Sequence, residues 1–173
     1  MNNYIKDIAD SLVKKVKTRN VKEIADFLNI HIYYNSNLED LYGFYTVIEK
    51  RKAIVVNSNL DRLTQRQVIA HEIGHDRLHS DIVKSNGIIQ EFELMDMRTK
   101  PEYEANAFAS HILIDDEELD LLSKEYNDFE VVSKILGVNI NMLMIKVVEL
   151  NKTGKKYSEM FIPKGDFLKK HNF

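Results

Sequence analysis

Cysteine is absent from the 173 residues of this sequence, which excludes disulfide scaffolds, cysteine-ligated metal sites and thiol catalysis. Proline occurs only 2 times and glycine only 6 times, so collagen-like and low-complexity chains are excluded as well. No apolar run approaches the ~18 residues that a membrane span needs. The N-terminal segment also lacks the apolar core of a signal peptide. We therefore expect a soluble, cytoplasmic protein.

Neither sign of charge dominates, because the sequence has 24 basic and 27 acidic residues and a net charge of −3. Such a molecule is not suited as a whole to binding a polyanion. The charges are nevertheless unevenly spread: residues 115–130 contain eight acids and one lysine, and residues 151–173 contain six lysines and two acids. We interpret these regions as a solvated helix face and a basic, mobile tail. The alternative is a docking surface for a charged partner.

Hydrophobic periodicity predicts an α+β fold that is mostly helical. We expect helices over residues 4–17, 21–28, 65–79, 101–114, 117–124, 129–136 and 140–150, and strands over 31–34, 43–48 and 53–56. The second and third strands read as a hairpin, so the small, three-stranded sheet is at least partly antiparallel and lies beside the helix of residues 65–79. Thr64 is a candidate cap of that helix, and Gly137 a candidate C-cap near the end of the chain. Residues 80–100 are less regular.

The sequence contains no internal repeat and no clear linker, so we expect a single domain over residues 1–173. Within it we distinguish a core region (18–114), a helical C-terminal part (115–150) and the basic tail (151–173).

The segment that carries chemistry reads His-Glu-Ile-Gly-His, from His71 to His75. On an α-helix, positions i and i+4 lie ~40° apart around the axis and ~6 Å along it. Both imidazoles therefore point the same way and can hold one metal ion. Glu72 flanks the pair, where its carboxylate can take a proton from water. This H-E-x-x-H pattern is typical of zinc metallopeptidases.

A third protein ligand is needed if one coordination position is to stay open for water. His79 lies about 12 Å along the helix from His71, too far for one ion, so we assign it a supporting role outside the ligand set. Two acids compete downstream, Glu102 and Glu104. Glu102 shares its helix face with small residues, which allow a close helix–helix approach, whereas Glu104 points ~200° away. Asn106, one turn after Glu102, can accept a hydrogen bond from a ligating ring.

With H-E-I-G-H followed after 27 residues by E-Y-E-A-N-A-F-A-S, the sequence resembles the ImmA/IrrE family of zinc metallopeptidases. The stretches T-R-N-V-K-E-I-A-D-F-L-N-I-H-I and A-I-V-V-N are similar to the family too. The resemblance implies a zincin-like fold of the gluzincin type, with one Zn²⁺ held by His71, His75 and Glu102, and with Glu72 as general base. It also implies a protein substrate, a DNA-binding repressor of a phage or mobile element.

The leading hypothesis is therefore a zinc-dependent endopeptidase that cleaves a helix-turn-helix repressor. The alternative is a non-catalytic zinc-binding sensor that regulates transcription by contact. Direct DNA binding through helix-turn-helix-like spacing at residues 136–140 is disfavoured, because that region has few basic residues. Two imidazoles and a carboxylate also suit iron or manganese.

Two features of the substrate site are open. Four residues are of a type that could stabilise an oxyanion: Tyr45, Tyr103, His79 and His111. The apolar strand around Val55 could form backbone hydrogen bonds with an extended peptide.

Overall fold

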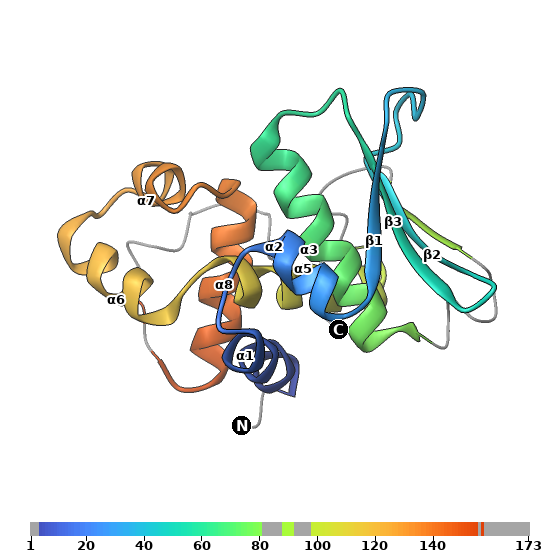
Figure 1. Ribbon diagram of the computed structural model, residues 1–173. Coiled ribbons are helices and arrows are strands. Elements are labelled where there is room, and N and C mark those ends of the chain that lie inside the picture. Colours follow the sequence, from blue (N-terminus) through green and yellow to red (C-terminus); the bar gives the residue numbers. More distant parts are fainter. Residues whose placement is uncertain (1–3, 81–87, 92–97, 156, 158–173) are drawn as a thin grey trace.

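The computed structural model describes residues 4–80, 88–91, 98–155 and 157 (Figure 1). Its helices are α1 (Tyr4–Val16), α2 (Val21–Phe27), α3 (Arg62–Leu78), α5 (Lys100–Leu113), α6 (Asp116–Glu125), α7 (Phe129–Leu136) and α8 (Ile140–Lys152). Its strands are β1 (Ile30–Asn35), β2 (Gly43–Ile48), β3 (Arg51–Asn57) and β4 (Ile88–Glu91). The predicted helices and strands are all present, so the α+β prediction is confirmed. Most of the predicted basic tail lies outside the described residues.

The sheet is mixed, with strand order β1-β3-β2-β4. β1 runs parallel to β3, and β2 is antiparallel to both β3 and β4. The predicted hairpin of β2 and β3 is present, and its turn places Glu49 and Lys50 at positive φ (49° and 66°). β4 adds a fourth strand to the three that were predicted. β4 lies in the segment that the sequence predicts to be irregular. Four residues are too few to show a periodic pattern, so the sequence did not indicate this strand.

β3 is an interior strand of this sheet. Val55 is paired with Tyr33 of β1 on one side and with Phe44 of β2 on the other. A strand has only two hydrogen-bonding edges, so the expectation that the strand around Val55 binds an extended peptide is wrong. Among the described strands, the outer positions belong to β1 and β4.

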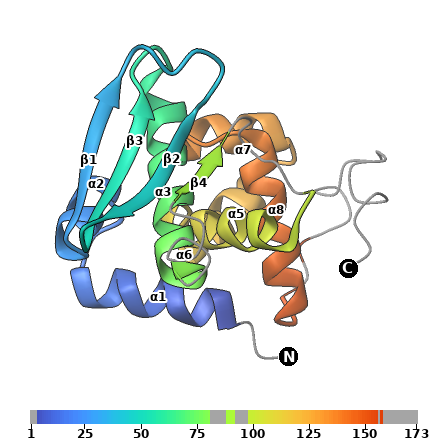
Figure 2. The same ribbon diagram turned by 90° about the vertical axis from the view of Figure 1, so that its right-hand side faces the viewer.

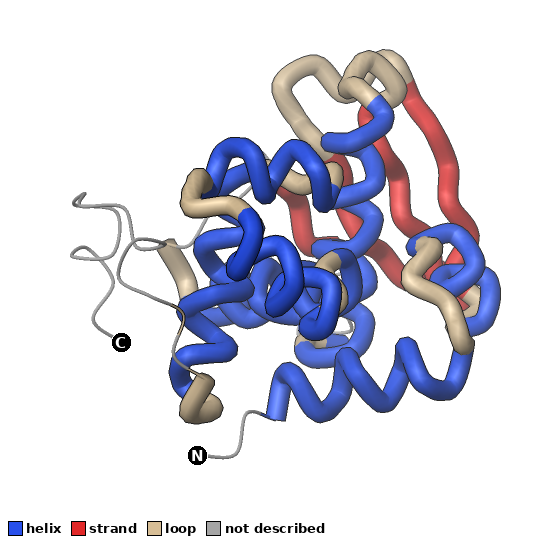
Figure 3. Tube along the Cα trace, turned by 90° about the vertical axis from the view of Figure 1, so that its left-hand side faces the viewer, coloured by secondary structure: helices blue, strands red, loops and turns tan. Residues whose placement is uncertain are grey.

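Helix α3 packs against β2 and β3 of the sheet and also against α5 (Figure 2). Figure 3 shows the strands gathered on one side of the molecule and most helices on the other. Every residue of α3 from Gln67 to Asp76 is buried, as expected for a helix covered on more than one side. The sheet approaches it closely at Gly43, where an added Cβ would lie 2.6 Å from Val68 Cγ1.

The cap of α3 is Asp61, and the prediction of Thr64 as cap is wrong. The Asp61 side chain accepts hydrogen bonds from the backbone N–H groups of Leu63 and Thr64. The Thr64 hydroxyl donates to the other Asp61 oxygen over 2.6 Å. Both residue types cap well, and the helix begins at the earlier one because Asp61 already has extended backbone (φ −64°, ψ 160°).

Some acids of the stretch 115–130 have partners within the protein. Asp115 and Asp128 cap α6 and α7. Asp116 forms ion pairs with Lys6 and Lys146, at 3.0 and 2.6 Å. Glu117, Glu118, Glu125 and Glu130 are exposed, in agreement with the interpretation of a solvated helix face.

The last two helices do form a bent pair, joined at Gly137 in the left-handed conformation (φ 62°), so the predicted C-cap is confirmed. Most of α8 is buried, including Met142, Leu143, Ile145 and Val147. A recognition helix must expose a face to DNA, and α8 exposes little of its surface. Among the described residues, no single helix is long and apolar enough for a membrane span. Only α7 and α8 taken together, bent by 100°, meet those criteria.

Candidate metal centre

Three side chains from two helices converge at the interface of α3 and α5. The Nε2 atoms of His71 and His75 lie 2.9 Å apart, and they are 3.1 and 3.4 Å from Glu102 Oε2. Ligands bound at about 2.1 Å in a tetrahedral site are about 3.4 Å from one another. The spacing of the three atoms therefore suits one small cation, and the structure brings together the three residues predicted as ligands.

Local structure explains why these atoms meet. The two histidines are one helical turn apart on α3, as the motif predicts. Glu102 lies in the first turn of α5, which is capped by Thr99 and has Pro101 as its second residue. The helices touch at Gly74, where an added Cβ would lie 3.0 Å from the Cα and carbonyl oxygen of Ala105. The absence of a side chain at Gly74 therefore lets α5 carry Glu102 up to the histidine pair.

Asn106 holds the first of these rings. Its side-chain oxygen lies 2.8 Å from His71 Nδ1, and both residues are fully buried. Because a side-chain amide oxygen only accepts hydrogen bonds, Nδ1 of His71 must carry the proton. The neutral ring then presents a bare Nε2 to the convergence point.

The second ring is held by His79, as its predicted supporting position suggests. His75 Nδ1 lies 3.1 Å from His79 Nδ1. The other nitrogen of His79, Nε2, lies 3.0 Å from Glu104 Oε2. Glu104 was considered as a ligand from the sequence and set aside because of its direction. The structure places it behind His79, a contact that no sequence pattern indicates.

The protonation states of the converging side chains favour the binding of a cation. Burial lowers the pKa of His75 to about 4, so this imidazole is neutral near pH 7. Glu102 Oε2 is buried and receives no hydrogen bond from the part of the chain that the structure describes. A carboxylate oxygen facing two imidazole nitrogens is the donor set that a divalent metal requires.

Comparison with known proteins agrees with this geometry. The family model of the IrrE N-terminal-like domain, Peptidase_M78, matches residues 25–147. The chain belongs to this family. It is 35% identical over 112 residues to the uncharacterized immunity region protein 2 of Bacillus phage phi105, covering 65% of this chain and 69% of the relative.

A second relative is the metallopeptidase ImmA of Bacillus subtilis strain 168, with 32% identity over 125 residues, 67% of this chain and 66% of the relative. The chain therefore spans about two thirds of the length of each. No solved structure matches significantly. Membership of Peptidase_M78 makes this an ImmA/IrrE-type metallopeptidase domain with a zincin-like α+β fold.

The general base that the resemblance implies, Glu72, follows His71 on α3 and is fully buried. Helix geometry places it ~100° from His71 and ~60° from His75, on the flank of the ligand pair. Its oxygens are not part of the converging group. A buried carboxylate costs free energy unless its surroundings stabilise it.

The four residues considered for oxyanion stabilisation all have other partners. Tyr45 donates to Asp76 over 2.6 Å, and Tyr103 donates to Glu149. His79 lies between His75 and Glu104, and His111 accepts from Lys146 over 2.9 Å. These contacts support packing and positioning roles for the four side chains.

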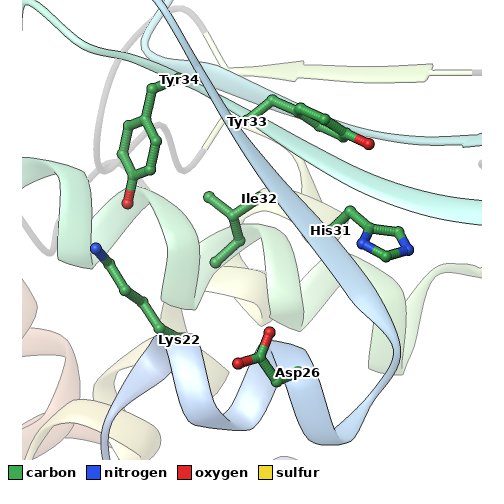
Figure 4. A pocket seen from close by; sticks show the side chains of 6 residues that line it. All are labelled: Lys22, Asp26, His31, Ile32, Tyr33 and Tyr34. Carbon is green, nitrogen blue, oxygen red and sulfur yellow. The ribbon is translucent and has the colours of Figure 1, made fainter.

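Two surface hollows lie away from the metal-ligand group. The smaller, of about 340 Å³, lies between α2 and β1 and is lined by Lys22, Asp26, His31, Ile32, Tyr33 and Tyr34 (Figure 4). Lys22 reaches toward the ring of Tyr34 there, at 5.3 Å from its centroid. The larger, of about 840 Å³, is lined by Arg19, Asn20, Val21, Lys22, Tyr34, Arg62, Gln65, Arg66 and Ile69. Neither is lined by a residue of the converging group.

Proposed function

We propose that this protein is a zinc-dependent endopeptidase that hydrolyses a peptide bond in a protein substrate. The observation that carries the proposal is the convergence of His71, His75 and Glu102 within 4.8 Å of one another. Three protein ligands leave a fourth tetrahedral position for water or substrate, which is the arrangement of catalytic zinc sites.

Each residue has a distinct part in the proposed reaction. His71 and His75 present neutral nitrogens, and Glu102 supplies one negative charge. A bound zinc ion supplies Lewis acidity, which polarises a carbonyl group and makes water more acidic. The Glu72 carboxylate accepts a proton from the attacking water and then donates it to the leaving amine.

For the substrate, we propose a DNA-binding repressor of the helix-turn-helix type, encoded by a phage or mobile element. The family resemblance supports this assignment, and one relative is named for a phage immunity region. In this proposal the partner is a protein, and the enzyme acts without binding nucleic acid itself. The buried α8 and the net charge of −3 agree with that.

Metal content provides the first test. Purified wild type should contain close to one zinc per chain by mass spectrometry, and Glu102→Ala should contain much less. Glu117→Ala, an exposed glutamate on α6, is the matched control and should retain the metal. Equal loading of wild type and Glu102→Ala would contradict the ligand assignment. Predominance of iron or manganese would replace zinc in the proposal.

Cleavage provides the second test. The wild type should cleave a candidate repressor, a chelator should abolish the reaction, and added zinc should restore it. Glu72→Gln should retain its metal yet lose activity by at least about 100-fold, the contribution of a general base. A fully metal-loaded wild type that binds the repressor without cleaving it would favour the non-catalytic sensor instead.

A further inference from the structure

A chain of hydrogen bonds runs from the N-terminal helix to the metal centre. Tyr4 of α1 donates to Glu104 Oε1 over 2.6 Å. The other oxygen of that carboxylate lies 3.0 Å from His79 Nε2, and His79 Nδ1 lies 3.1 Å from His75 Nδ1. Four side chains from three separate elements are thus linked end to end, and the last of them belongs to the converging group.

Hydrogen-bonding chemistry sets the direction of each bond. A carboxylate oxygen accepts, so Nε2 of His79 carries a proton and donates to Glu104. For Nε2 of His75 to bind a metal, the proton of that ring must lie on Nδ1. Nδ1–H of His75 then donates to Nδ1 of His79. The Nε2 atom of His75 is directed at Glu102, 3.4 Å from its Oε2.

We propose that Glu104 and His79 are positioning residues that fix the orientation and tautomer of His75 for metal binding. The inference rests on the proposed metal site and deepens it. Asn106 performs the same task for His71, so both rings present a bare Nε2 to one point. Partners of this kind typically contribute 10–100-fold to metal affinity.

Tyr4 extends the chain of hydrogen bonds beyond the region that matches the family model. The match begins at residue 25, whereas α1 spans Tyr4–Val16. Because Tyr4 bonds the same carboxylate that holds His79, the docking of α1 and the binding of metal are coupled. Coupling between two binding events is reciprocal, so metal should strengthen the docking of α1 as much as α1 strengthens metal binding.

The tautomer can be measured on metal-free protein by ¹⁵N NMR of the imidazole rings. In the wild type, His75 should carry its proton on Nδ1, and His79→Phe should convert it to a mixture of tautomers. His31→Phe, at an exposed strand position, is the matched control and should leave His75 unchanged. A wild-type His75 protonated mainly on Nε2 would overturn the proposal. This measurement needs no metal, so it stays decisive even if the wild type binds none and the proposed function fails.

Zinc affinity, measured by competition with a chromophoric chelator, gives the second readout. His79→Phe should weaken binding about 10–100-fold. Glu104→Gln keeps the side-chain shape and a weaker acceptor, so its zinc affinity should lie between that of His79→Phe and that of the wild type. Glu117→Gln should match the wild type. Wild-type affinity in both His79→Phe and Glu104→Gln would overturn the positioning role.

Hydrogen exchange tests the link to α1. Zinc should slow amide exchange in α1 of the wild type, and Tyr4→Phe should abolish most of that slowing. An equal effect of zinc on α1 in both proteins would overturn the coupling through Tyr4.

Discussion

His71 and Asn106 are 35 residues apart in sequence, and their side chains meet at 2.8 Å inside the protein. The contact joins α3 to α5 and leaves the ring nitrogen that faces the metal centre without a proton. A single buried amide therefore decides whether the first histidine of the motif can act as a ligand.

Replacing this amide should change metal affinity selectively. Asn106→Leu keeps the approximate volume but removes the acceptor, and it should weaken zinc binding about 10–100-fold. Asn106→Asp retains an acceptor of the same shape and should bind zinc at least tenfold more tightly than the Leu variant. Chelator competition measures both. Equal affinities in the two variants would contradict the positioning of His71 by its hydrogen bond.

The close approach at Gly74 should be sensitive to volume. Gly74→Val forces carbon atoms against the Ala105 backbone, which would lie 3.0 Å from the first of them. Overpacking of this kind costs about 1–3 kcal/mol, and displacement of α5 should also weaken zinc binding. Gly74→Ala should lose less stability, because the higher helix propensity of alanine relative to glycine offsets about 1 kcal/mol of the packing cost. Denaturant unfolding measures the stabilities, and a Val variant as stable as the wild type would contradict the tight contact.

Stability should fall in acid through His111. Burial, followed by the positive charge of Lys146, lowers the pKa of His111 to about 2. Below pH ~6.5 the unfolded chain therefore binds a proton that the folded chain does not. Folding stability then decreases as the pH falls from ~6.5 towards ~2, by up to about 1.4 kcal/mol per pH unit.

The variant His111→Gln isolates this effect, because a glutamine oxygen can still accept from Lys146 and does not titrate. Its free energy of unfolding should fall less steeply than that of the wild type between pH 6.5 and 4. Both proteins are measured metal-free, so that His75 contributes equally to both slopes. Parallel pH profiles would show that His111 is not the titrating group.

The turn between β2 and β3 should be improvable. Glu49 and Lys50 both occupy positive φ, as in a type I′ turn, where Asn-Gly is preferred. Substituting Asn-Gly should raise the free energy of unfolding by about 1 kcal/mol, because a left-handed conformation costs an ordinary residue roughly 1–2 kcal/mol. Lys50→Ala keeps that cost and serves as the control. A thermal midpoint unchanged by Asn-Gly would contradict the turn type.

Sequence reasoning failed where alternatives were locally equivalent. Asp61 and Thr64 are both good caps, and Asp61 becomes the cap because its backbone is extended and its side chain accepts from the N–H groups of Leu63 and Thr64. β4 is too short for its pattern to be read, and only its pairing with β2 makes it a strand. Glu104 was set aside as a ligand because of its direction on the helix, and its contact with His79 depends on how α5 packs against α3.

The sequence by itself determined the helices, the strand order along the chain and the placement of His71 and His75 on one helix face, because these follow from periodicities within a single element. The helix-face argument and the family resemblance also indicated Glu102, but only the tertiary structure decided how closely its oxygen approaches those rings and that His79 and Glu104 support His75. Those properties depend on two helices coming into contact at Gly74 and Ala105, and such an approach is set by the packing of the whole core.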